Sequence, residues 1–254
     1  MITFIAPTKN MKPQRASLPM SLPPFCVEAE ELWQILKNWN DETIMNVMNV
    51  NAKMALHVQE LLQHIRFDDN GSHALLTYSG LAFHAMNVSD WSDDDLRFAQ
   101  QHLRILSGFY GMVRPLDSIY PYRLEMQAKD ITERIGNLYT YWSDAMMQEM
   151  RQDCEDGIYI NLASREYAQA VMPYFKDEER CINIEFRTVK NHTVKTIATH
   201  AKIARGKMVR MMMKQRINDP QSLKRFQEDG WQFHSESSDE THYVFLKYDE
   251  KSLK

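Results

Sequence analysis

The sequence predicts a mixed α/β (α+β) fold in which helices surround a mixed, partly parallel sheet. Short apolar runs that suit buried strands occur at residues 2–6, 73–78 and 158–162. Segments of helical periodicity separate these runs, and two alternating segments at residues 181–189 and 193–200 predict a hairpin. Buried strands separated by helices are typical of a sheet that is at least partly parallel.

The length and composition predict a single domain over residues 1–254. With 254 residues, 44% of them hydrophobic, the chain can bury a sizeable core, and no shift in composition marks a boundary. No apolar run approaches the ~18 residues of a membrane span. The opening ITFIAPTKN lacks the basic and apolar regions of a signal peptide. We therefore expect a cytoplasmic protein with no membrane partner; the oligomeric state does not follow from the sequence.

Cysteine and histidine spacing favours neither a metal site nor a disulfide framework. The three cysteines are far apart, and His57 and His64 lack the i, i+4 spacing of helical ligands. Seventeen methionines are more simply explained as adaptable core filler. The motifs GxGxxG, GxxxxGK[ST], HExxH and GxSxG are absent from the sequence. We expect no metal and no cofactor.

The N-terminal half begins with a buried strand at residues 2–6, which places Lys9 in the loop at the strand's C-terminal end. A proline-rich loop and helical segments at residues 27–39 and 41–65 follow. Residues 73–78 predict a second buried strand, and a short helix is expected at residues 81–86. Ser92 and Asp95 form a candidate capping box for the next helix.

The C-terminal half contains a helical segment at residues 138–150 and a strand at 158–162. Asn161, Ser164 and Tyr167 stand at the C-terminal end of that strand; Ser164 can cap a helix, and Asn161 can tie down a loop. The hairpin turns around residues 190–192 and leads into a basic helix. Residues 243–248 alternate in the way expected of an edge strand.

The stretch LRILSGFYGMVRPLDSIYPYRLEM, residues 103–126, predicts a helix-hairpin-helix-like element. A helical start is followed by a turn with Gly108 and Gly111 and by a second, very short helix. Arg104, Arg114 and Arg123 lie in or beside the breaks. Such a turn can offer free backbone N–H groups to a phosphate.

The basic helix carries positive charge without compensating acids. Six basic residues and no acidic one lie between Thr199 and Arg216, so the net charge of −4 combines +6 here with −10 elsewhere. A positive stripe on an acidic body is typical of a local phosphate-binding face. The alternative is an ordinary solvated helix, and the missing acids, which rule out pairing within the helix, make the two interpretations about equal.

Several long segments resemble the YaaA family of bacterial peroxide stress proteins. They are FAQQHLRILSGFYGMVRPLD, PYRLEM, INLASREY and AKIARGKMVR, and the similarity extends from ITFIAPTKNM to YVFLKY. The resemblance implies a cytoplasmic, DNA-binding protein with a helix-hairpin-helix that helps cells survive peroxide by limiting reactive iron. It implies no catalysed reaction.

Two functions remain open from the sequence. In the first, the protein binds the DNA backbone with low sequence specificity, through a basic cleft formed by Lys9, Arg104, Gly108, Gly111, Arg114, Arg123, Lys202, Arg205, Lys207, Arg210 and Lys214. In the second, it is an enzyme acting on a nucleotide or nucleobase. The candidate catalytic residues are then Lys9, Asn161, Ser164, Tyr167 and Lys202, supported by Tyr122, Arg123 and Arg205. A closed pocket around Lys9 and Asn161 would favour the enzyme, and an open groove wide enough for a duplex would favour DNA binding.

Overall fold

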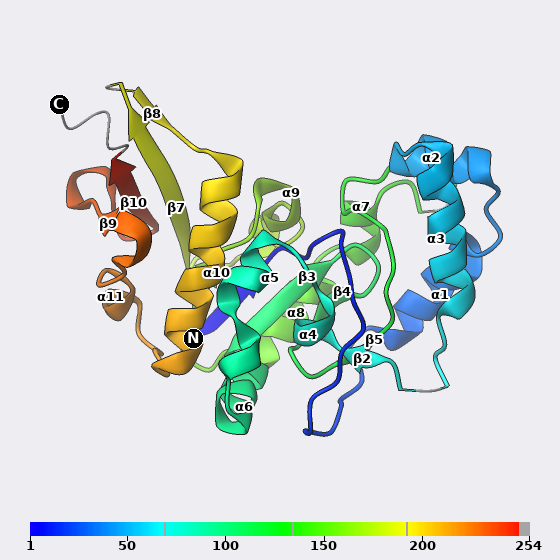
Figure 1. Cartoon of the computed structure of the whole chain (residues 1–254), viewed down its shortest axis with the longest axis horizontal. Helices are drawn as coiled ribbons and strands as arrows, with labels where there is room; N and C mark the ends of the chain where they lie inside the picture. Colours follow the sequence, from blue (N-terminus) through cyan, green and yellow to red (C-terminus); the bar gives the residue numbers. More distant parts are fainter. Residues whose placement is uncertain (69, 134, 192, 249–254) are drawn as a thin grey trace.

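The fold is built on one mixed sheet, seen in a computed structural model that describes residues 1–68, 70–133, 135–191 and 193–248 (Figure 1). The strand order is β4-β3-β1-β6-β7-β10-β9, and β8 pairs with β7. Neighbouring strands run parallel from β3 to β10: β3 (Leu103–Ser107), β1 (Ile2–Ile5), β6 (Ile158–Asn161), β7 (Arg180–Lys190) and β10 (His242–Tyr248). The antiparallel strands are β4 (Gly111–Val113), β8 (Thr193–Lys195) and β9 (Gln232–Phe233). The predicted mixed, partly parallel α/β class is confirmed.

Helices surround this sheet. In Figure 1, α5 (Leu81–Met86), α6 (Asp93–His102) and α10 (Ala198–Lys214) lie together on one face. The helices α1 (Cys26–Leu36), α2 (Asp41–Met48) and α3 (Ala52–His64) gather at one end of the molecule, away from β9 and β10. The shorter helices are α4 (Ala74–Thr77), α7 (Leu138–Trp142), α8 (Ala145–Gln152), α9 (Arg165–Ala168) and α11 (Pro220–Leu223). None of the helices of the described residues combines the length and apolar character needed to span a bilayer.

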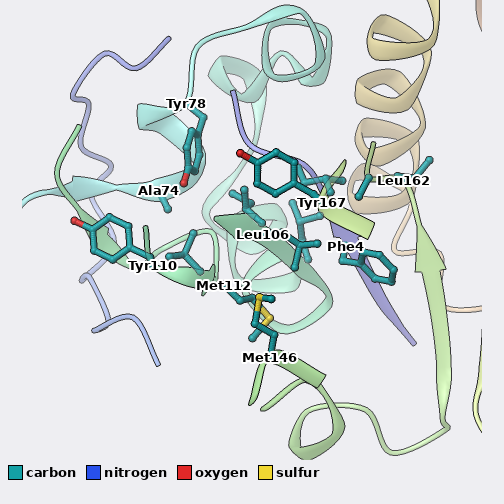
Figure 2. Close-up of a cluster of buried hydrophobic side chains, with 14 of the residues drawn as sticks. Phe4, Ala74, Tyr78, Leu106, Tyr110, Met112, Met146, Leu162 and Tyr167 are labelled. Atoms are coloured by element: carbon teal, nitrogen blue, oxygen red, sulfur yellow. The ribbon is translucent and has the colours of Figure 1, made fainter. Parts of the chain in front are cut away.

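The core is centred on β1, whose four residues are all buried. Thr3 lies opposite Leu103 on one side and Ile160 on the other, so every backbone group of this strand can be paired between two parallel neighbours. Figure 2 shows part of this core, with Phe4 and Leu106 from neighbouring strands and Tyr78, Tyr110 and Tyr167 around them. Burial on both faces explains why this strand is a continuous apolar run.

Most of the predicted elements are confirmed, with adjusted ends. The first strand, the helix at residues 81–86 and the strand β6 occur as expected, and Ser92 and Asp95 form a complete capping box. Left-handed backbone at Asn49 and Ser143 divides two of the predicted helices. The hairpin of β7 and β8 is present, but α10 begins at Ala198, so the second arm is shorter than predicted. His192, in its turn, lies outside the described residues.

Two strand predictions are wrong. The structure has only β2 (Ser72–His73) at the second apolar run, and residues 74–77 form α4. A short buried apolar run suits either a helix or a strand, and its tertiary surroundings decide between them. The segment at residues 243–248 is β10, but it is not an edge strand because β9 pairs along its outer side. A two-residue strand such as β9 leaves no periodic signal in a sequence.

The helix-hairpin-helix prediction is also wrong, because its first helix is a strand. Residues 103–107 form β3, which pairs in parallel with β1 and antiparallel with β4 after a turn at residues 108–110. The backbone N–H groups of Phe109 and Tyr110 donate to Ser107 Oγ at 3.2 and 2.8 Å. They are therefore not free for a phosphate. Both glycines of this turn are buried.

Gly111 is expected to be a structural corner rather than a ligand contact. Its φ is +66°, and a Cβ there would lie 2.8 Å from the Trp142 ring. Gly230 is a matched control, since its φ of +79° imposes similar backbone strain but nothing lies within 4 Å of an added Cβ. Each alanine substitution should cost about 1–2 kcal/mol for left-handed backbone. Because of the added contact with Trp142, Gly111→Ala should lower the urea-unfolding midpoint clearly more than Gly230→Ala does. Equal decreases in the midpoint for the two variants would contradict this account.

Candidate functional site

A cavity of about 530 Å³ lies where the chain leaves the carboxyl ends of β1 and β6. From β1 the chain continues to β3 on one side of the sheet, and from β6 it continues to β7 on the other. Adjacent parallel strands whose connections diverge leave a crevice between them, and α/β proteins commonly bind ligands there. Residues 6–10 after β1 and Leu162, Ser164, Glu166 and Tyr167 after β6 line this cavity. Its size suits a small organic ligand.

Two glycines let the walls of the cavity approach one another. A Cβ on Gly80 would lie 2.3 Å from Thr8 Oγ1, so the loop after β1 packs directly on the start of α5. A Cβ on Gly206 would lie 2.0 Å from the carbonyl oxygen of Ala82, so α10 packs directly on α5. No other residue allows this backbone contact. As a result, the loop after β1, α5 and α10 form one continuous wall.

Glu125 is the acidic centre of one side of the cavity. Its Oε1 lies 2.8 Å from Lys9 Nζ and 3.1 Å from Arg123 Nη2. These distances make ion pairs, yet neither contact has the angles of a hydrogen bond, and both carboxylate oxygens are buried without a hydrogen-bond donor in the described part of the chain. The Nε–H of Arg123 is also buried without an acceptor there. Buried polar groups are normally satisfied by protein, water or ligand.

The wall formed by α10 carries two cations without acidic partners. Among the described residues, neither Lys202 nor Arg205 forms an ion pair, and Arg205 Nε is buried without a hydrogen-bond acceptor. Burial lowers the pKa of the Arg205 guanidinium, opposed only by Glu185, which itself pairs with Arg187. Four cationic residues, Lys9, Arg123, Lys202 and Arg205, thus face two carboxylic acids, Glu125 and Glu166. The cavity is positively charged.

Tyrosines and Glu166 complete the polar surface. Tyr122 shares hydrogen bonds with Ser107 Oγ at 2.7 Å and with the Tyr78 hydroxyl at 2.9 Å. Burial raises the pKa of Tyr122 to about 12, although these two hydrogen bonds oppose the increase. Burial also raises the pKa of the Glu166 carboxyl, and the charge of Glu125 adds to that effect. The cavity therefore offers aromatic faces and a carboxyl group that protonates more easily than usual.

The structure brings together nearly all the residues of the enzyme hypothesis. Lys9, Ser164, Tyr167 and Lys202 line the cavity, and so do the supporting residues Tyr122, Arg123 and Arg205. Asn161 is the exception: its amide donates to Asn183 Oδ1 at 2.8 Å, and its Oδ1 accepts the N–H of Ala163 at 2.9 Å. It ties down the loop after β6. Ser164 occupies the N-cap position of α9 without a side-chain capping bond and lines the cavity, so its hydroxyl can face a ligand.

Two arginines of the DNA hypothesis have internal partners. Arg104, only 1% exposed, donates to the carbonyls of Gln100, Gln101 and Leu103 and to Asp153 Oδ2 at 2.7 Å. It thereby satisfies carbonyl groups at the C-terminal end of α6. Arg114 pairs with Glu149 at 2.8 Å and with Asp153 at 2.9 Å. These contacts place both side chains outside the cavity wall.

The other cations of α10 pair with acids from distant segments. Lys207 lies 2.7 Å from Asp229, Arg210 lies 2.6 Å from Asp90, and Lys214 lies 2.9 Å from Asp95. The helix itself lacks acids, as the sequence indicates, but the tertiary structure supplies them. DNA contact by these three residues remains a prediction, and it would require them to exchange partners.

Sequence reasoning missed two important residues of the cavity, Glu125 and Glu166. Glu125 does have a signal, because a glutamate between Leu124 and Met126 in an apolar segment is unusual. Glu166 lies beside Tyr167, which sequence reasoning did select. In the described residues no group of three or more His, Cys, Asp or Glu side chains could hold a metal ion.

These features define an α/β protein with a positively charged cavity at the carboxyl edge of its sheet. The chain belongs to the family described as "Peroxide stress protein YaaA", whose sequence model matches residues 1–237. It is 36% identical over 248 residues to a UPF0246 protein of Clostridioides difficile, which covers 97% of this chain and 100% of that protein. A UPF0246 protein of Lactobacillus acidophilus is 37% identical and one of Lactobacillus johnsonii is 38% identical, each with 96% of both chains covered. The resemblance to the YaaA family is confirmed.

The ion pair between Asp95 and Lys214 is expected to make stability depend on acid pH. Burial by itself would raise the pKa of Asp95, but hydrogen bonds from Lys214 and Ser92 outweigh it and lower this pKa to about 2. This stabilisation is complete above the ordinary pKa of about 4 and is lost as the pH falls through 2. Asp95→Asn should cost about 0.5–2 kcal/mol at pH 7, a loss that narrows below pH 4.

The neighbouring Asp94→Asn serves as the control in urea unfolding, because Asp94 is exposed and forms a surface ion pair with Arg97, which should contribute little. A loss for Asp95→Asn that is the same at pH 7 and pH 3 would refute the assignment.

Proposed function

We propose that the cavity binds an anionic ligand of nucleotide size and that the protein's role in peroxide stress acts through this ligand. The observation that carries the proposal is Arg205, whose buried Nε has no acceptor and whose guanidinium forms no ion pair in the described chain; Glu185 attracts it but itself pairs with Arg187. A half-buried cation that forms no ion pair loses hydration that the protein does not replace, and this is energetically costly. A phosphate would supply both the charge and the acceptor oxygens, and arginine binds phosphate in a two-point geometry.

The remaining surface supports a ligand with a planar, partly apolar body. Ile5, Phe83, Met86, Leu124 and Leu162 line the cavity beside the rings of Tyr122 and Tyr167. A nucleotide combines a ring that can pack on such a surface with a phosphate that can meet Arg205 and Lys202. The same cavity would be the place for a reaction on the nucleotide, with Lys9 or Lys202 as the base or nucleophile.

Binding of the DNA backbone is the second candidate function. In this candidate the DNA-binding protein also helps to limit iron-dependent peroxide damage. DNA binding is supported by Lys9, whose side chain is 59% exposed, and by exposed Lys202, both at the cavity. A strand phosphate or an unstacked nucleotide of DNA could therefore use the same site as a free nucleotide. The two candidates differ in whether the rest of a polynucleotide adds to the affinity.

Removing Arg205 should weaken ligand binding, whereas removing Arg210 from the same helix should not. Each change, Arg205→Met and Arg210→Met, deletes one positive charge, but Arg210 pairs with Asp90 outside the cavity. Loss of a charged hydrogen bond is worth about 1.5–3 kcal/mol, or roughly 10- to 150-fold in affinity. We expect this loss for AMP or GMP in calorimetric titration of Arg205→Met and less than about a threefold change for Arg210→Met. Equal losses, or no binding by the unmodified protein, would reject the proposal.

If the protein binds DNA at this cavity, affinity for a duplex should depend on salt and on two lysines. The logarithm of the affinity should fall by about 0.9 per phosphate contact for each unit of log salt, and Lys9→Ala and Lys202→Ala should each reduce that slope by about one contact. Fluorescence anisotropy over a salt series measures this, with added AMP as a competitor. If duplex affinity depends neither on the salt concentration nor on added AMP, the cavity is not a DNA-binding site.

A further inference from the structure

Three residues of the cavity have buried polar atoms without hydrogen-bond partners in the described chain, and these atoms fall into two groups. Arg123 Nε and the carboxylate oxygens of Glu125 belong to the segment that follows β5 (Ser118–Ile119), and Arg205 Nε belongs to α10. Arg205 is a donor alone, suited to an anion. Arg123 and Glu125 together present a donor beside an acceptor, since Arg123 Nη2 lies 3.1 Å from Glu125 Oε1. The two groups therefore suit different ends of one ligand.

The role of Glu125 as a simple counter-ion does not explain this arrangement. The ion pairs with Lys9 and Arg123, at 2.8 and 3.1 Å, balance the charge at Oε1 without giving it a hydrogen bond. They leave Oε2 without a donor and Arg123 Nε without an acceptor. A carboxylate that is 7% exposed loses most of its hydration, so its second oxygen needs a donor from a ligand or an ordered water.

The segment that carries Arg123 and Glu125 is held firmly. A Cβ on Gly108 would lie 2.5 Å from the carbonyl oxygen of Leu124, so the turn after β3 packs directly against this backbone. Tyr122 is anchored by its hydrogen bonds to Ser107 and Tyr78. Both side chains thus extend from a backbone fixed before any ligand arrives, which is the condition for selective recognition.

We propose that Arg123 and Glu125 form a base-recognition subsite: Arg123 Nε–H donates to an acceptor atom on one edge of a nucleobase, and Glu125 Oε2 accepts an N–H from the same edge. The inference rests on the proposed function, in which the phosphate binds Arg205 at the other wall. Purine bases present this pair, as the N1 acceptor and N6 amino group of adenine or the O6 acceptor and adjacent N–H of guanine. The site then selects nucleotides over other phosphate esters.

The test compares AMP and GMP with ribose 5-phosphate, which keeps the phosphate and sugar but lacks the base. By calorimetry the unmodified protein should bind at least one nucleotide about tenfold or more tighter than ribose 5-phosphate, the value of one charged hydrogen bond. Glu125→Gln should abolish most of that ratio, whatever the change in absolute affinity from its altered charge. Arg205→Met should weaken all ligands together and preserve the ratio.

A second variant, Arg123→Lys, keeps a cation beside Glu125 but removes the Nε–H, and it should reduce the same ratio even if Glu125→Gln folds poorly. Equal binding of nucleotides and ribose 5-phosphate by the unmodified protein would overturn the base-recognition subsite and leave the anion site standing. Retention of the ratio in folded Glu125→Gln or in Arg123→Lys would overturn it too. If no phosphate ligand binds at all, the proposed function fails together with the inference.

Discussion

The contact of α10 with α5 at Gly206 is the constraint on which the site depends. With a Cβ position only 2.0 Å from the Ala82 carbonyl oxygen, the two backbones are closer than any other residue allows. This approach brings Lys202 and Arg205, within one turn of Gly206, to the cavity instead of to open solvent. Gly80 does the same for the loop after β1, where Thr8 and Lys9 lie. The cavity exists because two glycines remove the side chains that would separate its walls.

Charge pairing gives the cavity its character. The acids Asp90, Asp95 and Asp229 neutralise the other cations of α10, and Asp153 pairs with both Arg104 and Arg114. These pairs tie α10 to the start of α6 and tie β3 to α8, so they serve the fold. Of the lysines and arginines of α10, all of them among the described residues, Lys202 and Arg205 are the two without an ion pair, and both line the cavity. A net basic helix on an acidic protein thus becomes a small basic cavity and not an extended basic stripe.

The peroxide-stress family of the chain and the geometry of its cavity complement each other. The family places the protein in a cellular response, and the cavity suggests the chemical form of the molecule through which it acts. A site with a lone guanidinium at one wall and a donor beside an acceptor at another suits a ligand with two unlike ends. Polar groups held ready in a partly dry site bind strongly because little is lost in ordering them.

The sequence alone predicted the α/β class, the strands β1 and β6, the hairpin, the capping box and the basic helix, because each depends on local periodicity or a local hydrogen bond. It also selected seven residues of the cavity, because polar groups at the ends of buried strands, basic residues beside a glycine turn and a helix without acids are all local patterns. It predicted a helical start at residues 103–107 and was wrong there, since a run of five buried residues suits both a helix and a strand and only the pairing with β1 selects the strand.

Only the tertiary structure decided which charges are free. Asp90 lies 120 residues before Arg210 along the chain, yet the two side chains meet at 2.6 Å. Asp229 comes from the other direction, after α10, and reaches Lys207. Ion pairs join residues by position in the fold, and no spacing rule in the sequence reports them. The same holds for the isolation of Arg205 and the close approach at Gly206, which depend on neighbours brought together by folding.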